Sequence, residues 1–297
     1  MSVRKRRDNR NFLAFAGIAM IGFILFYVYP ISRTIYLSLT DTRIMDPYHS
    51  FVGFDNFVTA IQEDQIFHLA LKNTFRYAIA VAILKLGLAL FAALLLANRI
   101  RGIGIFRSVF FLPFVIPAFA VAYVFRFFFH PANGLVNQGL EKVGIEPLGW
   151  YADSKTALMT LVISSLWGFG VPMLIFLAAL QNVPKDLHEV AQLDGANRWQ
   201  RFRVVTIPAI SPVLFFNVIL STIDSLKSFD LAFLMGRGEG YPANSTLLYS
   251  VYLFNQAFKS PFTLGYASAL ALIFFVILLT LTGINFLLSR LYVKSEN

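Results

Sequence analysis

The sequence predicts an all-α membrane protein with six transmembrane helices. Hydrophobic residues make up 57% of the 297 residues and charged residues only 14%, whereas a soluble domain averages about 25% charged residues. Six apolar stretches are long enough to cross a bilayer, which takes about 20 residues per helix. None of these stretches alternates apolar and polar residues, so a transmembrane barrel is excluded. Helices then satisfy the backbone polar groups in lipid.

The expected spans follow one another along the whole chain. They cover residues 12–37, 75–97, 107–129, 156–180, 210–235 and 265–289. The first run follows a basic cluster, Arg4–Arg7, but it is too long for a signal peptide and lacks a small-residue cleavage site, which predicts an uncleaved anchor. We therefore expect an N-terminal tail over 1–11, one membrane domain over 12–289 and a C-terminal tail over 290–297.

Basic residues predict the orientation of these spans. Most Lys and Arg residues lie in the N-terminal tail, between the second and third spans, in the 181–209 loop and in the C-terminal tail. The positive-inside rule therefore puts both termini and the 181–209 loop in the cytoplasm. The net charge of +9 is explained by this topology and does not require nucleic acid as a partner. The loops 38–74, 130–155 and 236–264 then face outward, and their aromatic and turn residues favour ordered structure.

The most distinctive polar segment is the 181–209 loop. Pro184 suits the first turn of a helix, and Gly195 can take the left-handed conformation that ends one. A second short helix is expected from Ala196 to Val205, with Pro208 marking its exit into the fifth span. The residues alone leave two interpretations open: a compact knob that docks on another protein, or an amphipathic loop that lies on anionic membrane lipid.

The spacing within this loop resembles that of a known family. Glu189-x-Ala191, then Gly195, then Val205-x-Ile207-Pro208 is similar to the EAA loop of binding-protein-dependent ABC importer permeases. The sequence departs from that pattern at Val190, where Ala is usual, but keeps an apolar side chain. The resemblance implies that the loop is a coupling element that docks on an ATPase subunit. The residues it assigns to docking are Glu189, Ala191, Asp194, Gly195, Arg201 and Pro208.

The resemblance extends over most of the chain. Three segments are similar to parts of the first-type subunit of the carbohydrate-type permeases, the maltose and glycerol-phosphate kind. They are Val52–Phe57, Asn133–Asn137 and Gly265–Ala269. This implies a prokaryotic inner-membrane importer of an oligosaccharide or related polyol. It also implies four kinds of partner: a second, homologous permease subunit, two ABC ATPase subunits, an extracytoplasmic solute-binding protein and the carbohydrate solute.

The sequence shows no motif or cluster of residues that would carry chemistry within this chain. No Gly-x-x-x-x-Gly-Lys-Ser/Thr phosphate loop occurs, so ATP and Mg are expected on the partner ATPase subunits. There is no cysteine, and the four His are scattered without metal-ligand spacing. We therefore expect no catalytic residue, no metal and no cofactor on this chain. A membrane enzyme and an ion-driven secondary transporter remain as rival classes; the first requires a catalytic cluster and the second inverted repeats, and neither is found.

The fifth span carries a polar stripe. Asn217, Ser221, Asp224 and Ser228 are spaced i, i+4, i+7 and i+11, which is one face of a helix. One hypothesis is that this face lines the translocation path; the alternative is that it holds helices together.

Charged residues in and near the spans need partners, because ionisable groups are costly in lipid. Lys227 has the spacing to pair with Asp224 or Asp230, and Lys85 in the second span requires a partner such as Asp224. Five residues are candidate kinks, without evidence that they act in transport: Pro113, Pro117, Gly168, Gly170 and Pro172.

Overall fold

The structure is a computed structural model that describes residues 16–46, 49–97, 102–259 and 263–292. The predicted tail over 1–11 and most of the tail over 290–297 lie outside these residues. The described residues form helices and connecting loops, with two isolated β-bridges, Thr40 to Phe51 and Arg43 to Asp46. They divide into two compact units: one contains the chain up to Asp64 with Leu253–Val276, and the other contains Gln65–Tyr252 with the chain from Ile277.

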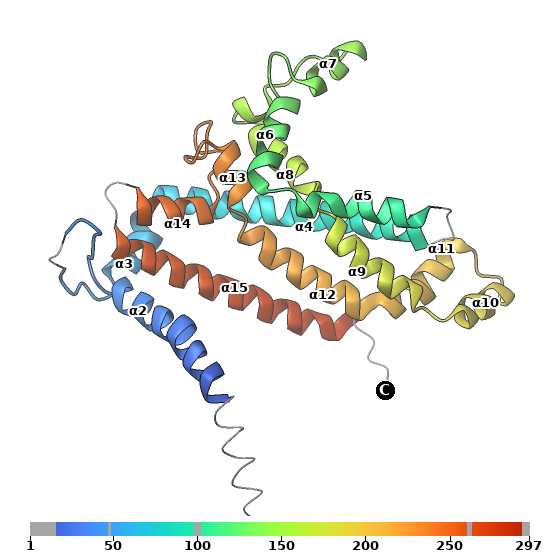
Figure 1. Cartoon of the computed structure of the whole chain (residues 1–297), viewed down its shortest axis with the longest axis horizontal. Coiled ribbons are helices and arrows are strands. Elements are labelled where there is room, and N and C mark those ends of the chain that lie inside the picture. The colour runs from blue at the N-terminus through green and yellow to red at the C-terminus, as the bar shows by residue number, and fades with distance from the viewer. Residues whose placement is uncertain (1–15, 47–48, 98–101, 260–262, 293–297) are drawn as a thin grey trace, which may run out of the picture. The chain divides into compact units, whose positions relative to one another are not determined.

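The helices confirm a polytopic all-α membrane protein (Figure 1). Four are long and apolar enough to cross a bilayer, namely Ala16–Ser38, Gln65–Ala97, Arg198–Met235 and Leu264–Ser289. Two bent helix pairs also pass this test when each pair is taken together: α5 (Ile103–Val115) with α6 (Ala118–Phe128), and α8 (Ala157–Leu166) with α9 (Gly170–Gln181). With each pair counted as one span, the described residues contain six spans in the predicted order.

The expected third span, 107–129, is not one straight helix. α5 and α6 meet at an angle of 100°. Between them Ile116 is extended, with φ −76° and ψ 128°, and Pro117 caps α6. A proline disfavours helical geometry in the residue before it and has no N–H to continue the helix. Pro113 lies inside α5, so the sharp bend occurs at Pro117 rather than at Pro113.

The fourth span bends by 45° between α8 and α9. Gly170 opens α9 directly against α5, because a Cβ on this residue would lie 1.9 Å from the carbonyl oxygen of Phe110. Only glycine permits this approach. The bend at Gly168 and Gly170 therefore has a packing cause as well as a conformational one.

α4 (Gln65–Ala97) is the central helix of the second unit and packs against α8, α9 and α12 (Ile207–Leu226). It begins ten residues before the predicted span at 75–97. Residues 65–74 include polar side chains that lower the local hydropathy, yet Phe67, Ala70 and Thr74 are buried along one side of this extension. Further along, small residues such as Ala89 and Ala93 pack with Phe176 of α9 in the hydrophobic core, as is typical where membrane helices approach closely.

The loop over 130–155 is ordered, as predicted. It contains α7 (Leu135–Lys142) and the short η3 (Trp150–Ala152). Asn137 is buried and connects the loop: its amide donates to the carbonyls of Pro131 and Leu148, and its Oδ1 accepts from Trp150 Nε1 at 2.6 Å. One asparagine thus satisfies several backbone and side-chain groups of this loop.

The first unit contains η1 (Ile24–Val28), α2 (Tyr29–Ser38), α3 (Asp55–Val58), η2 (Thr59–Glu63), most of α14 (Tyr249–Phe258) and the first part of α15 (Leu264–Tyr292). Asn56 donates to the carbonyl oxygens of Ser38 and Thr40 at 2.8 and 2.9 Å. Tyr266 donates to Asp64 at 2.5 Å. These hydrogen bonds hold the first part of the predicted outer loop 38–74 in place.

Candidate functional site

The 181–209 loop folds into two short helices joined at a glycine. α10 (Lys185–Leu193) begins after Pro184, which is its N-cap rather than a residue of its first turn. Gly195 follows the helix with φ +80°, in the left-handed region, as predicted. The second helix, α11 (Arg198–Arg201), begins two residues later than expected from Ala196.

The later start of α11 has a clear cause at its cap. The Asn197 side chain accepts from the Gln200 backbone N–H at 3.0 Å, and the Gln200 side chain accepts from the Asn197 N–H at 2.7 Å. This reciprocal capping box fixes the first turn. Arg201 then donates to the Gln192 side-chain oxygen at 2.8 Å, which ties α11 to α10. The two helices are therefore held together as a compact knob.

Pro208 lies at the entry into the fifth span, as predicted, but the chain has no break there. α11, the π-helical turn η4 (Phe202–Thr206) and α12 follow one another without a break. Pro208 lies in the first turn of α12, directly after the π-helical turn, so the helical run contains a residue that has no N–H to donate to the turn before it. The consequence is that the knob continues directly into the fifth span as one helical run from Arg198 to Leu226.

The predicted docking residues occupy different environments on this knob. Glu189, Asp194 and Gly195 are exposed, whereas Ala191, Arg201 and Pro208 are half-buried.

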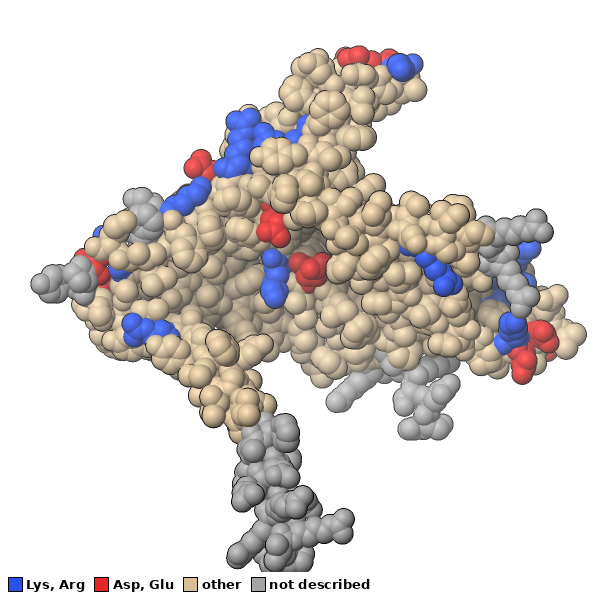
Figure 2. Space-filling view, in the orientation of Figure 1, with Lys and Arg blue, Asp and Glu red and all other residues tan. Residues whose placement is uncertain are grey.

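Beside them, α10 exposes a row of apolar side chains: Leu187 is 50% exposed, Val190 56% and Leu193 88%. We call Leu187, Val190 and Leu193 the apolar row. Acidic and basic side chains are both visible around this part of the chain, at the lower right of Figure 2. Apolar residues exposed together among charges mark a contact surface.

A cavity of about 290 Å³ lies within the second unit, where α12 meets the other spans. Its walls are mostly apolar, and its four polar side chains come from α4 and α12. The lining residues are Lys85, Phe114, Gly168, Val171, Pro172, Ile175, Asn217, Leu220, Ser221 and Asp224. Three of the four residues predicted to form a polar stripe therefore face one cavity.

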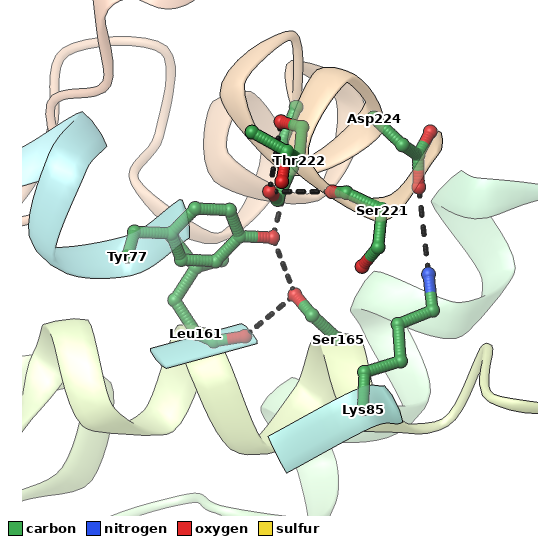
Figure 3. A network of polar contacts seen from close by, with 9 residues as sticks. Tyr77, Lys85, Leu161, Ser165, Ser221, Thr222 and Asp224 are labelled. Carbon is green, nitrogen blue, oxygen red and sulfur yellow. Dashed lines mark hydrogen bonds and ion pairs between the residues drawn. The ribbon is translucent and has the colours of Figure 1, made fainter. Parts of the chain in front are cut away.

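The polar side chains of this cavity differ in how they are satisfied. Asn217 is 2% exposed and donates to the Val213 carbonyl at 3.2 Å. The Ser221 hydroxyl oxygen is buried and has no hydrogen-bond partner among the described residues. Asp224 lies 3.4 Å from the ammonium of Lys85, which supplies the partner that the sequence required for Lys85 (Figure 3).

Ser228 does not share this helix face. α12 ends at Leu226, with Lys227 as its C-cap, so the helical spacing stops before Ser228. The Ser228 hydroxyl instead lies 3.1 Å from that of Tyr77. The Tyr77 hydroxyl is itself 2.6 Å from that of Ser165 (Figure 3). Tyr77 and Ser165 were not among the predicted residues, because one tyrosine and one serine in apolar spans give no distinguishing pattern.

The charge pairs expected within the fifth span are wrong. In the part of the chain that the structure describes, no ion pair joins Lys227 to Asp224 or to Asp230. Asp224 pairs with Lys85 of α4 instead, so the contact joins two spans rather than two turns of one helix. Within the same described residues, no group of three His, Cys, Asp or Glu has the geometry to hold a metal ion.

Comparison with known proteins identifies the family. Residues 86–294 match the model of the binding-protein-dependent transport system inner membrane component. The chain is 41% identical to the probable ABC transporter permease protein YesP of Bacillus subtilis (strain 168), over 98% of this chain and 94% of that one. It is 35% identical to the lactose transport system permease protein LacF of Rhizobium radiobacter, over 97% of each chain. Identity to the diacetylchitobiose uptake permease NgcF of Streptomyces coelicolor is 34%, over 94% of this chain and 82% of that one.

A solved structure has the same fold. A chain of a bacterial ABC transporter involved in the import of the acidic polysaccharide alginate superposes with a TM-score of 0.82, at 23% identity, over 98% of this chain and 100% of that one. The chain is therefore a multi-pass inner-membrane protein that transports without catalysing a reaction, because the ATPase of such importers is a separate subunit. It belongs to the family of binding-protein-dependent transport system inner membrane components and is a permease subunit of a sugar ABC importer.

Proposed function

We propose that this chain forms half of the translocation path for an oligosaccharide, and that its knob transmits the motion of an ATPase to the cavity. The observation that carries the proposal is the uninterrupted helical run from Arg198 to Leu226. It starts in the knob and carries Asn217 and Ser221 at the cavity. A displacement of the knob is therefore transmitted along one continuous helical run, with no loop in between to absorb it.

The proposed assembly contains four partners of this chain. A second, homologous permease forms the other half of the path, two ABC ATPase subunits bind ATP and Mg, and an extracytoplasmic binding protein delivers the solute. Both termini and the 181–209 loop face the cytoplasm in this arrangement, because the basic residues concentrate there. The knob then lies on the side where ATP is available.

The apolar row supports docking on the ATPase rather than on lipid. A loop that lies on anionic headgroups would bury its apolar side chains in the membrane. Here α10 carries Lys185, Asp186, His188 and Glu189 among the three apolar side chains, and the acidic residues oppose attraction to anionic lipid. Burial of the row against a protein groove stabilises the complex roughly in proportion to the apolar area covered.

The relatives support the solute class. Their names give lactose, diacetylchitobiose and arabinooligosaccharides as transported sugars. These solutes share glycosidic linkages and many hydroxyl groups. The unpartnered Ser221 hydroxyl is a group that can exchange hydrogen bonds with such a solute.

Co-purification of the tagged chain with its second permease and ATPase tests the docking proposal. Leu193→Ser should release the ATPase, because Leu193 is the most exposed member of the apolar row. Ile145→Ser is the matched control, since Ile145 is also an exposed apolar residue, at 51%, but lies far along the chain from the knob. Equal retention of the ATPase by both variants would refute docking through the apolar row.

The alternative for the polar face of α12 is contact with the partner permease. Asn217→Ala and Ser221→Ala distinguish the two roles. If these residues face the solute, transport falls while the complex still assembles. If they hold the two permeases together, the variants purify without their partner.

A further inference from the structure

Lys85 is the unusual residue of the cavity. It lies in the middle of α4, a 33-residue apolar helix, and its side chain is only 16% exposed. An ammonium in such a position is unfavourable unless an anion accompanies it. Among the described residues, the acceptor that Lys85 reaches is Asp224 Oδ2.

The contact between Lys85 and Asp224 is a weak one. Its 3.4 Å length exceeds the roughly 2.7–3.2 Å of a normal N–H···O bond. The Asp224 side chain is 75% exposed on this chain, whereas that of Lys85 is 16% exposed. The two partners are therefore placed unequally: the carboxylate lies at the surface of the chain, whereas the ammonium lies inside the cavity, where it requires an anion.

The cavity leaves room beside the ammonium. Gly168 lies next to Lys85, and a Cβ at this glycine would be 3.7 Å from Lys85 Nζ. The absence of a side chain at position 168 keeps that side of the ammonium open to the cavity. The cavity volume of about 290 Å³ lies just below the roughly 300–1,000 Å³ found for small-molecule sites.

We propose that Lys85 is a recognition site for a carboxylate on the solute, so that the transported sugar is an acidic, uronate-bearing saccharide. The solute carboxylate takes the place of Asp224 on the ammonium, and a solute hydroxyl bonds to Ser221 Oγ. This inference rests on the proposed function of the cavity as part of the path. A neutral sugar, by contrast, would leave the Lys85–Asp224 pair intact and would gain nothing from the charge.

Asp224 gives this exchange its reversibility. Its carboxylate lies at the surface of the chain, three residues before the exposed Lys227. It also competes with the solute for the ammonium, so the solute is not held permanently. Removal of Asp224 should accordingly strengthen solute binding, whereas removal of Lys85 should weaken it.

The test is ligand-observed saturation-transfer NMR on the complete transporter in nanodiscs, without the binding protein. The probes are digalacturonate and neutral digalactose with the same linkage, which differ in their carboxylates. We expect the natural transporter to bind digalacturonate roughly ten- to a hundredfold more tightly, the range of one charge-assisted hydrogen bond. Lys85→Met should abolish this preference, Lys85→Arg should retain it, and Asp224→Asn should increase it.

Lys72→Met is the matched control, because Lys72 is an exposed lysine on the same helix outside the cavity. It should leave the preference unchanged, and ATPase retention and thermal stability verify that each variant is folded. Equal binding of both probes, weakened alike by Ser221→Ala, would overturn the acidic-solute inference and keep the cavity in the path. Absence of binding by either probe would overturn the inference together with the proposed role of the cavity.

Discussion

Gly195 offers a test of whether the shape of the knob, and not only its composition, determines docking. Its φ of +80° is a conformation that costs an L-residue about 1–2 kcal/mol. No atom lies within 4 Å of the position that a Cβ would take, so Gly195→Ala adds backbone strain without a steric clash. If the strain is relieved by leaving the docking-competent shape, the affinity for the ATPase falls roughly 5- to 30-fold.

Two further substitutions make this prediction specific. Gly195→Asn should weaken binding less than Gly195→Ala, because asparagine tolerates the left-handed region better than alanine. Gly87→Ala is the control: Gly87 lies inside α4, also with no atom within 4 Å of its Cβ position, and alanine is favoured there by about 0.5–1 kcal/mol. The assay is titration of purified ATPase against the permease pair in nanodiscs, with fluorescence-detected binding.

The affinity for the ATPase is expected to be highest for the natural chain, lower for Gly195→Asn and lowest for Gly195→Ala. Gly87→Ala should bind the ATPase as tightly as the natural chain. Equal affinities for all three residues at position 195 would refute the reasoning, because they would show that docking does not depend on the left-handed turn. A fall in affinity for Gly87→Ala would show that the assay reports general instability rather than the shape of the knob.

Three other substitutions test the packing and the loops. Gly170→Ala should lower the free energy of unfolding by about 1–3 kcal/mol, because its Cβ would collide with the Phe110 carbonyl. An unchanged free energy of unfolding in nanodiscs would contradict that close approach. Tyr77→Phe should cost about 1–3 kcal/mol by leaving its buried hydroxyl partners unsatisfied, measured by thermal unfolding, and a neutral effect would argue against the network. Hydrogen bonds from Ser50 lower the pKa of Asp41 below its usual 3.8. The ionised carboxylate therefore stabilises the loop that contains Asp41 and Ser50 above pH 3.8. This stabilisation is lost as the pH falls through the lowered pKa. Amide exchange at Ser50 should quicken across that window in the natural chain but not in Asp41→Asn; identical profiles would refute this account.

Local features of this fold were predictable where one residue type decides the conformation. The left-handed turn at Gly195 followed from the absence of a Cβ, and the six apolar stretches followed from the thickness of the bilayer. The angle at Pro117 was not predictable in the same way. The sequence shows that the helix is interrupted there, but the 100° bend depends on how α5 and α6 pack against their neighbours.

The candidate site was predictable only as far as helical periodicity held. Asn217, Ser221 and Asp224 reached one cavity because α12 is regular over that stretch. Ser228 did not, because the helix ends at Leu226, two residues before it. The pairing of Lys85 with Asp224 is a contact between residues 139 positions apart, which no local pattern can specify, although the energetic need for such a partner was clear.

The π-helical turn Phe202–Thr206 has a geometric consequence for the knob. Its closing bond runs from the Ile207 N–H to the Phe202 carbonyl, one residue longer than an α-helical bond. The wider turn takes up one residue more than an α-helical turn. Deletion of one residue from Phe202–Thr206 would therefore leave an α-helical turn and keep the apolar row facing in nearly the same direction. In the regular part of α12 each residue advances about 100° around the axis, so a deletion there would rotate the apolar row relative to the cavity. The knob is thus expected to tolerate the loss of a residue in this turn and to lose its direction when a residue is removed from the helix that follows.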